Sequence, residues 1–227
     1  MSNVPRLLQL CSQALPVGAY AYSGGLESAI SRGYVHDRET TFAWVSGVLR
    51  MNIAQLDLPA LIIAEKAWRK SDVKTLNRLN GYLQASRESA ELLLEDVEMG
   101  RSLQRLMGDL GEPHPACESP SFVVLFAVAG TNWEIPIADL VAGYCYSWLE
   151  NQVAAATKSV PLGQTDAQII LGKLLGEIDG CLADAQQAAE GGSAGIEEGQ
   201  WQFGRSLPML GLLSAQHEVL DARLYRS

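Results

Sequence analysis

The sequence predicts an all-helical protein, a single-domain bundle of about eight to ten helices over residues 1–227. Apolar residues recur three and four positions apart through most of the chain, the spacing that places side chains on one face of a helix. Residues that alternate in polarity with the period of a strand are almost absent. β-Branched residues are also sparse beside leucine and alanine, which favours helix over strand.

Five helices are expected in the N-terminal half. The longest starts after Asp37, whose side chain is suited to accept a hydrogen bond from a free N–H of the first turn. Pro59 lacks an N–H and is therefore expected to kink or end this helix. The other four are a helix that begins at Leu7 and is closed by Pro16 and Gly18, a helix that begins at Leu26, and two helices over residues 72–85 and 87–107.

The clearest helix of the C-terminal half covers residues 136–158, where apolar residues repeat three and four apart. Pro136 suits its first turn, because the first N–H groups of a helix have no partner within it. Before this helix, Ser119 is expected to cap an apolar helix through Phe126, with Pro120 at the first helical position.

A break at residues 160–163 precedes a further predicted helix. Thr165 and Gln168 have the spacing of a capping box, in which each side chain satisfies a free backbone N–H. Apolar residues then run four apart to Leu182. The glycine-rich, acidic stretch at 191–199 is expected to end that helix and to form a mobile loop.

The composition excludes several classes of protein. The formal net charge of -9 disfavours nucleic acid as a partner, because an acidic surface repels the phosphate backbone. The longest apolar run, residues 122–129, is far shorter than the roughly 20 residues needed to cross a bilayer, and no signal peptide is recognised. Four cysteines are scattered without a CxxC pair, which indicates reduced thiols. We therefore expect a soluble, cytoplasmic protein that binds neither nucleic acid nor a membrane.

Sequence motifs of enzymes are missing. Neither a GxxxxGK[ST] phosphate-binding loop nor a GxSxG nucleophile motif occurs. Ser23, in a glycine-rich turn, is more consistent with the entry into a helix than with a nucleophile. The three histidines, His36, His114 and His217, lack metal-ligand spacing. We predict no catalytic, cofactor-binding or metal-binding residue, and no enzyme activity. For His217, hydrogen bonding or packing, contact with a partner and a transient contact with a metal stay open.

Four glutamates recur three and four positions apart on one predicted helix: Glu88, Glu91, Glu95 and Glu98. A charge run of this kind usually marks a solvated face of a helix. Gly100 follows them, and a glycine inside a helix costs roughly 1 kcal/mol against alanine. We therefore expect a solvated glutamate stripe with one close helix crossing at Gly100.

Two segments are unusual for simple connections or chain ends. Residues 15–27 form a long, glycine-rich turn that contains Tyr20 and Tyr22, which are candidates for either the core or a binding surface. Residues 220–227 carry Leu224, Tyr225 and two arginines, although chain ends usually fray. Tyrosine and arginine are favoured anchors of protein interfaces. Both segments are therefore candidate partner-binding sites.

Four stretches together resemble the UreF family of urease accessory proteins, and they occur in the family's order over nearly the whole chain. The chain departs from the family pattern at Gly24 and at Gln216, just before the His-Glu pair. The four stretches are residues 15–27, Ser86-Arg87-Glu88 with Glu91 and residues 98–100, residues 146–150 with 160–164, and His217-Glu218 with residues 223–227.

The resemblance implies an all-helical homodimer that takes part in nickel insertion into apo-urease. It implies binding to a UreD/UreH-type accessory protein that sits on apo-urease, and recruitment of the UreG-type GTPase that delivers nickel. The N-terminal turn and the C-terminal residues would contact the accessory protein, and Lys158 would contact the GTPase. The partner-binding residues predicted on this basis are Tyr20, Tyr22, Ser23, Glu27, Lys158, His217, Glu218, Arg223, Leu224, Tyr225, Arg226 and Ser227.

Three functions compete at this stage. The first is a scaffold that joins the urease-bound accessory protein to the GTPase. The second is a regulator of GTP hydrolysis that supplies an arginine, for which Arg87, Arg101 and Arg223 are the candidates. The third is a helical small-molecule enzyme that uses Ser23 or His217, which turnover without any partner would reveal.

Overall fold

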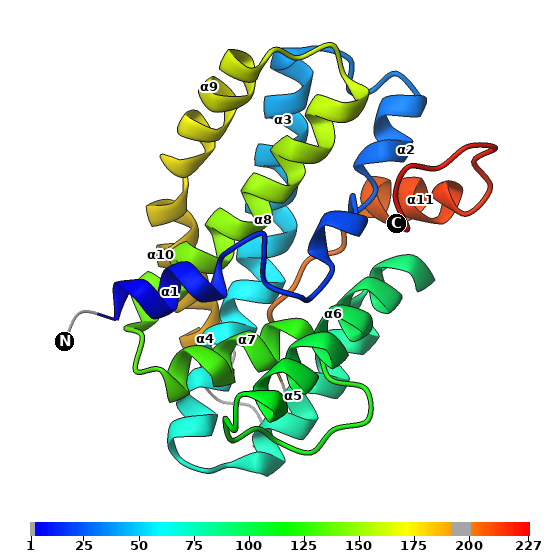
Figure 1. Ribbon diagram of the computed structural model, residues 1–227. Coiled ribbons are helices and arrows are strands. Elements are labelled where there is room, and N and C mark those ends of the chain that lie inside the picture. Colours follow the sequence, from blue (N-terminus) through cyan, green and yellow to red (C-terminus); the bar gives the residue numbers. More distant parts are fainter. Residues whose placement is uncertain (1–2, 192–200) are drawn as a thin grey trace.

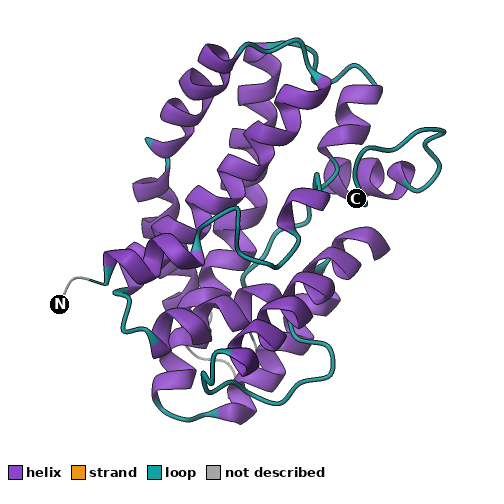
Figure 2. Ribbon diagram, viewed as in Figure 1, coloured by secondary structure: helices purple, strands orange, loops and turns teal. Residues whose placement is uncertain are grey.

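A computed structural model describes residues 3–191 and 201–227 (Figure 1). These residues form helices joined by loops, with no strand among them, which confirms the all-helical prediction (Figure 2). Apart from Gly191, the mobile loop predicted at 191–199 lies outside the described residues. The elements are α1 (Val4–Leu10), η1 (Ala19–Ala21), α2 (Leu26–Ser31), α3 (Arg38–Val48), η2 (Leu49–Asp57), α4 (Leu58–Arg69), α5 (Val73–Ser86), α6 (Ala90–Asp109), α7 (Phe122–Asn132), α8 (Ile137–Ser159), α9 (Gln164–Leu175), α10 (Ile178–Gly191) and α11 (Pro208–His217).

The helix expected after Asp37 is longer than predicted. Asp37 caps it as expected, and its Oδ1 accepts a hydrogen bond from the Thr40 N–H at 2.8 Å. Pro59 does not end it, because α3, η2 and α4 run on as one helix from Arg38 to Arg69. The nine residues of η2 form π-helical turns directly before the proline. Such wider turns accommodate a residue that has no N–H to donate.

Unlike the apolar run at 122–129, this long helix meets the length and hydropathy criteria for crossing a membrane. Its most apolar window is 67% buried inside the fold. Burial of this kind is typical of the core helix of a globular protein, since a helix that is apolar on most sides is covered by its neighbours.

Helix α7 lies at the centre of the main core, and its residues from Phe122 to Gly130 are all buried. It packs against α4 and α6, and α8 and α1 also contact it. The predicted cap of this helix is wrong: α7 begins at Phe122 and its N-cap is Ser121. A residue from another helix supplies the cap, because Asp96 Oδ1 accepts hydrogen bonds from the Phe122 N–H and the Ser121 hydroxyl at 3.0 Å each.

The capping box predicted from Thr165 is also wrong. Helix α9 begins one residue earlier, at Gln164, and its N-cap Gly163 makes no side-chain hydrogen bond. The single helix expected as far as Leu182 is two helices, because α9 ends at Leu175 and Gly176 separates it from α10. Glycine has a low helix propensity, so the helix can end at Gly176 even though the apolar spacing continues beyond it.

A second, smaller core cluster joins distant parts of the chain. It contains residues of α2, the end of α8 and α11, together with Tyr225. Figure 1 shows the C-terminus beside α2 and α11 at one side of the molecule. This cluster therefore brings both ends of the sequence together, and the candidate site lies around it.

Gly100 marks the close crossing that the sequence predicts. A Cβ at this position would lie 2.0 Å from the carbonyl oxygen of Pro120. We expect Gly100→Ala to lower the free energy of unfolding by about 2–3 kcal/mol, because backbone atoms would have to move. Gly81 in α5 has open space around its Cβ, so Gly81→Ala should raise stability by about 0.5–1 kcal/mol. Urea denaturation measures both, and equal stability of the two variants would contradict the close crossing.

Candidate functional site

His217, at the end of α11, connects three helices. Its side chain is completely buried. Nδ1 lies 2.9 Å from Glu91 Oε2 on α6, and Nε2 lies 2.8 Å from Glu27 Oε2 on α2. Hydrogen bonds to a carboxylate are stronger than those between neutral groups. Of the roles that the sequence left open for His217, the structure shows the hydrogen-bonding one.

Glu27 also holds the chain that follows α11, residues 218–227, which we call the tail. Its Oε1 accepts a hydrogen bond from the Leu224 N–H at 2.7 Å, and its Oε2 accepts one from the Tyr225 N–H at 3.1 Å. Arg223 Nη1 lies 3.5 Å from Glu91 Oε1. The same pair of glutamates that holds His217 therefore fixes the tail on α2 and α6.

The last residues of the tail are bound to the N-terminal turn. The Arg226 N–H donates to the carbonyl oxygen of Ala21 at 2.8 Å. The Ser23 N–H donates to the Ser227 carbonyl oxygen at 3.0 Å, and the Ser23 hydroxyl donates to the same oxygen. The Ser227 hydroxyl in turn donates to Glu95 Oε2 at 2.7 Å. We call this whole set of contacts, from His217 to Ser227, the tail clasp.

The glycine pair of the N-terminal turn allows the chain to reach the tail. Gly24 and Gly25 adopt the left-handed conformation, with φ of 57° and 81°. Residues with a Cβ rarely adopt these angles. At Gly25 a Cβ would also lie 3.1 Å from the Leu210 side chain of α11. Glycine is therefore required at Gly25 both for the turn and for the packing of α2 on α11.

The structure divides the twelve predicted partner-binding residues into two groups. The buried group forms the tail clasp and its packing: Tyr22, Ser23, Glu27, His217, Tyr225 and Ser227. The exposed group presents side chains to solvent from the same or contacting segments: Tyr20, Lys158, Glu218, Arg223, Leu224 and Arg226. Lys158 belongs with them because its Nζ lies 5.3 Å from the centre of the Tyr225 ring.

The prediction of a solvated glutamate stripe on α6 is wrong for most of its members. Glu91 is buried against His217, Glu95 accepts from Ser227, and one oxygen of Glu88 accepts the Leu207 N–H. Among these four glutamates, Glu98 forms an ion pair with an exposed residue: its Oε1 lies 2.9 Å from Arg101 Nη1. Glu88 lies before the start of α6, and the other three glutamates are on that helix. The tail and α11 cover the face that carries Glu91 and Glu95.

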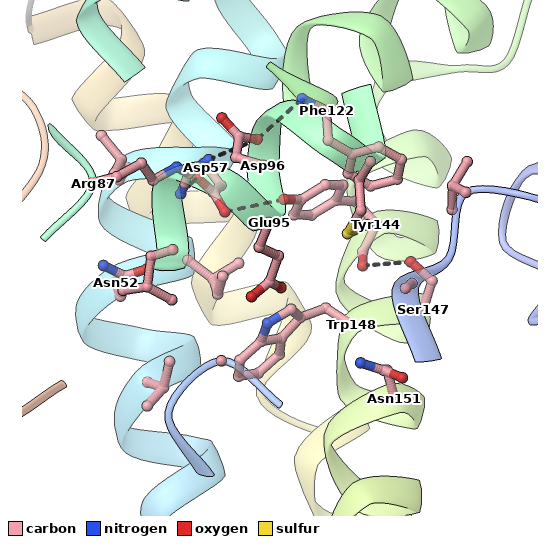
Figure 3. Close-up of a pocket in the computed structure, with 18 of the residues that line it drawn as sticks. Asn52, Asp57, Arg87, Glu95, Asp96, Phe122, Tyr144, Ser147, Trp148 and Asn151 are labelled. Carbon is pink, nitrogen blue, oxygen red and sulfur yellow. Dashed lines mark hydrogen bonds and ion pairs between the residues drawn. The ribbon is translucent and has the colours of Figure 1, made fainter. Parts of the chain in front are cut away.

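A buried ion cluster lies beside the clasp (Figure 3). Arg87 Nη1 is 2.8 Å from Asp57 Oδ1, and Arg87 Nη2 is 3.2 Å from Asp96 Oδ1. The Tyr144 hydroxyl donates to Asp57 Oδ2 at 3.0 Å. Burial raises the pKa of Asp57, although Arg87 opposes this. Burial alone would lower the pKa of Arg87, but Asp57 and Asp96 outweigh it and raise the pKa.

A cavity of about 130 Å³ opens next to this cluster. Its polar wall contains residues of the cluster together with Glu95 and Asn52, and its apolar wall contains Trp148 (Figure 3). Asp57 and Asn52 come from η2, so the π-helical segment shapes the cavity. π-Turns are often found at functional sites. Asp57, Asp96 and Glu95 were not predicted as site residues, because η2 and α6, which carry them, are far apart in the sequence and come together only in the fold.

Glu95 has a pKa close to neutral pH. Burial raises its pKa to about 7, and Asp96 and Asp57 act in the same direction, while Ser227 and Arg87 oppose it. A carboxyl with this pKa changes its charge around neutral pH. Glu95 therefore gains and loses its charge where the tail clasp and the cavity meet.

Within residues 3–191 and 201–227, no group of three or more histidine, cysteine, aspartate or glutamate side chains is placed to hold a metal ion. All four cysteines are free thiols. Burial raises the pKa of Cys11 and of Cys145 to about 12. These two thiols are therefore protonated at neutral pH and weak as nucleophiles or metal ligands.

The fold and the site together define an all-helical protein whose buried polar side chains bind its own C-terminal tail. Comparison with known proteins then identifies the family. Residues 35–175 match the family model UreF. The chain belongs to the UreF family of urease accessory proteins.

Relatives align along almost the entire chain. A protein of Teredinibacter turnerae named urease accessory protein UreF is 43% identical over 224 residues, which is 97% of each chain. Proteins with the same name from Marinomonas sp. and Hahella chejuensis are 41% and 40% identical, and each alignment covers 98% of this chain. At this coverage the matches extend beyond residues 35–175 at both ends.

Proposed function

We propose that this chain acts in nickel insertion into apo-urease as a non-catalytic, cytoplasmic scaffold. In this role it joins a UreD/UreH-type accessory protein on apo-urease to the UreG-type GTPase that delivers nickel. Membership of the UreF family supports the connection with urease. Nickel is the cargo of this assembly, and the chain works as a homodimer.

The observation that carries the proposal is the tail clasp. Seven of the ten tail residues are exposed. Glu27 and the Ala21 carbonyl hold the backbone N–H groups of Leu224, Tyr225 and Arg226 beneath them. Leu224 is 70% exposed although its N–H is bound inside. A preordered segment loses less conformational entropy on binding than a frayed one. The exposed side chains of Tyr20, Arg223, Leu224 and Arg226 form the proposed accessory-protein surface.

Regulation of GTP hydrolysis is the second candidate function. Of the three arginines considered for it, Arg87 has a side chain only 11% exposed and paired with two aspartates, so its guanidinium is not available to a nucleotide on a partner. Arg101 and Arg223 are exposed, each with one glutamate partner. These two arginines are therefore the ones to test for a regulatory role.

Reconstitution separates the two functions. Purified chain, accessory protein and GTPase are mixed, and complex formation and GTP turnover are measured for the wild type, for the chain without residues 223–227 and for Arg101→Ala. If the chain is a scaffold, the truncated chain should fail both to form the complex and to change the rate of GTP turnover. Loss of turnover stimulation in Arg101→Ala with full complex formation favours the regulator. If the truncated chain assembles as tightly as the wild type, the proposed surface is wrong.

A further inference from the structure

The cavity beside the ion cluster has the charge of a cation site. Its wall contains four carboxylates and one guanidinium, with no lysine or histidine among the described residues that line it. Arg87 is already neutralised by Asp57 and Asp96, at 2.8 Å and 3.2 Å. Within residues 3–191 and 201–227, Glu88 and Glu95 form no ion pair with a basic side chain, and their hydrogen bonds come from the Leu207 N–H and the Ser227 hydroxyl. The cavity therefore carries negative charge that the fold does not balance locally.

Buried acceptor atoms on this wall have no hydrogen-bond donor. Asp96 is 6% exposed, and its Oδ2 has no hydrogen-bond partner among the described residues. The Oε2 atom of Glu88 is also buried without a partner. Buried acceptors are normally satisfied, because an unpaired one costs roughly 1–3 kcal/mol. Arg87 Nε is likewise buried without a partner, so the unsatisfied polar atoms of the described residues that line the cavity are two acceptors and one donor.

The rest of the wall is apolar. Figure 3 shows the Glu95 side chain directed towards the indole of Trp148, on the side of the cavity away from Arg87. Met99, Leu92 and Ile53 add aliphatic surface. An indole face attracts organic cations, and aliphatic side chains favour the alkyl part of such a cation. A hydrated inorganic ion gains little from these neighbours.

We propose that this cavity binds an amphipathic organic cation, an alkylammonium or alkylguanidinium group, with its charged end near Glu95 and its alkyl part against Trp148. The volume of about 130 Å³ admits a group of four or five heavy atoms. Two sources supply this chemistry: a free small molecule, or a lysine or arginine side chain of a bound protein. The second source rests on the proposed scaffold function, and the first does not.

Glu95 gives the proposed site a pH dependence. Because burial raises its pKa to about 7, the carboxyl is mostly neutral at pH 6 and mostly ionised at pH 8. A cation favours the ionised form, so affinity should rise on the order of tenfold from pH 6 to pH 8. The other charged or titratable residues among the described residues that line the cavity are Cys11, Tyr20, Asp57, Arg87, Glu88, Asp96 and Tyr144.

The test uses n-butylammonium, which matches a lysine side chain, and the full chain labelled at its five tryptophan indoles with ¹⁵N. Comparison with Trp148→Phe identifies the Trp148 signal. We expect n-butylammonium to shift that signal saturably at pH 8. Glu95→Gln retains a hydrogen-bond acceptor for Ser227, and should weaken binding about tenfold. Glu98→Gln, on the exposed part of the same helix, should change binding less than about twofold.

Three results would overturn the proposal. One is no saturable shift of Trp148, and a second is equal binding by Glu95→Gln and Glu98→Gln. The third is an equal response to 1-butanol or to potassium chloride at the same concentration, which would show no need for an organic cation. These measurements use the isolated chain, so their failure leaves the proposed scaffold function untouched.

Competition then identifies the source of the cation. If a partner supplies the side chain, saturating n-butylammonium weakens binding of the accessory protein to the wild type but not to Glu95→Gln. If binding of the accessory protein is unaffected, the site takes a free small cation.

Discussion

Replacing Arg87 by methionine is expected to lower the free energy of unfolding by about 3–5 kcal/mol, because Asp57 and Asp96 would be left buried without a counter-charge. Both aspartates are at most 6% exposed, so water cannot take over the role of the guanidinium. Urea denaturation at pH 8 measures the change. The loss should be smaller at pH 5, because burial raises the pKa of Asp57 and this carboxyl, without the guanidinium beside it, binds a proton as the pH falls.

Arg101→Met is the matched control. Arg101 pairs with Glu98 at a similar distance, 2.9 Å, but both side chains are over 40% exposed. Exposed pairs contribute about 0–1 kcal/mol, so this variant should be nearly as stable as the wild type. Combining Arg87→Met with Asp57→Asn and Asp96→Asn should restore part of the lost stability, since the unpaired charges are removed. Equal losses for Arg87→Met and Arg101→Met would contradict the buried cluster.

Replacing His217 by alanine is expected to release the tail and to destabilise the protein by about 3–5 kcal/mol. The imidazole separates Glu27 from Glu91, and without it the two carboxylates share one buried site. Glu27 would then turn away from Glu91, and would hold the N–H groups of Leu224 and Tyr225 less well. Hydrogen exchange of these two backbone N–H groups should become much faster.

His36 provides the control for this experiment. Its side chain is 62% exposed and its ring contacts only nearby atoms of its own turn. His36→Ala should change the free energy of unfolding by less than about 0.5 kcal/mol and leave the tail amides protected. Unchanged protection of Leu224 and Tyr225 in His217→Ala would show that the histidine does not hold the tail.

Most helices could be predicted because their apolar spacing and their caps depend on residues that are close together in the sequence. Asp37 caps the long helix as its local sequence indicates. The predictions failed where a distant residue decides the local structure. Asp96 caps α7 from another helix, and no local pattern around Ser119 contains that information. The π-helical turns before Pro59 likewise depend on the packing of the long helix in the core.

The candidate site was predictable only as a set of unusual segments. The tyrosines and glycines of the N-terminal turn and the arginines of the tail stood out because simple turns and frayed ends do not need them. Their mutual contacts could not be foreseen, since Glu27 and Tyr225 are 198 positions apart. The partners of Glu91 and Glu95 could not be predicted for the same reason. The spacing of these glutamates is typical of a solvated helix face, but in the fold α11 and the tail cover them. Long-range pairing of polar groups is the part of the site that a single sequence does not encode locally.

The central claim is that the clasped tail presents its outward side chains to the UreD/UreH-type accessory protein. Leu224→Asp combined with Arg226→Glu alters these side chains and keeps the backbone N–H groups that bind Glu27 and Ala21. Val73→Asp, at an exposed residue of α5, is the matched control. Equilibrium binding to the purified accessory protein is the most direct measurement. The account predicts at least about tenfold weaker binding for the double variant, and wild-type binding for Val73→Asp. Wild-type affinity of the double variant, with unchanged stability, would contradict it.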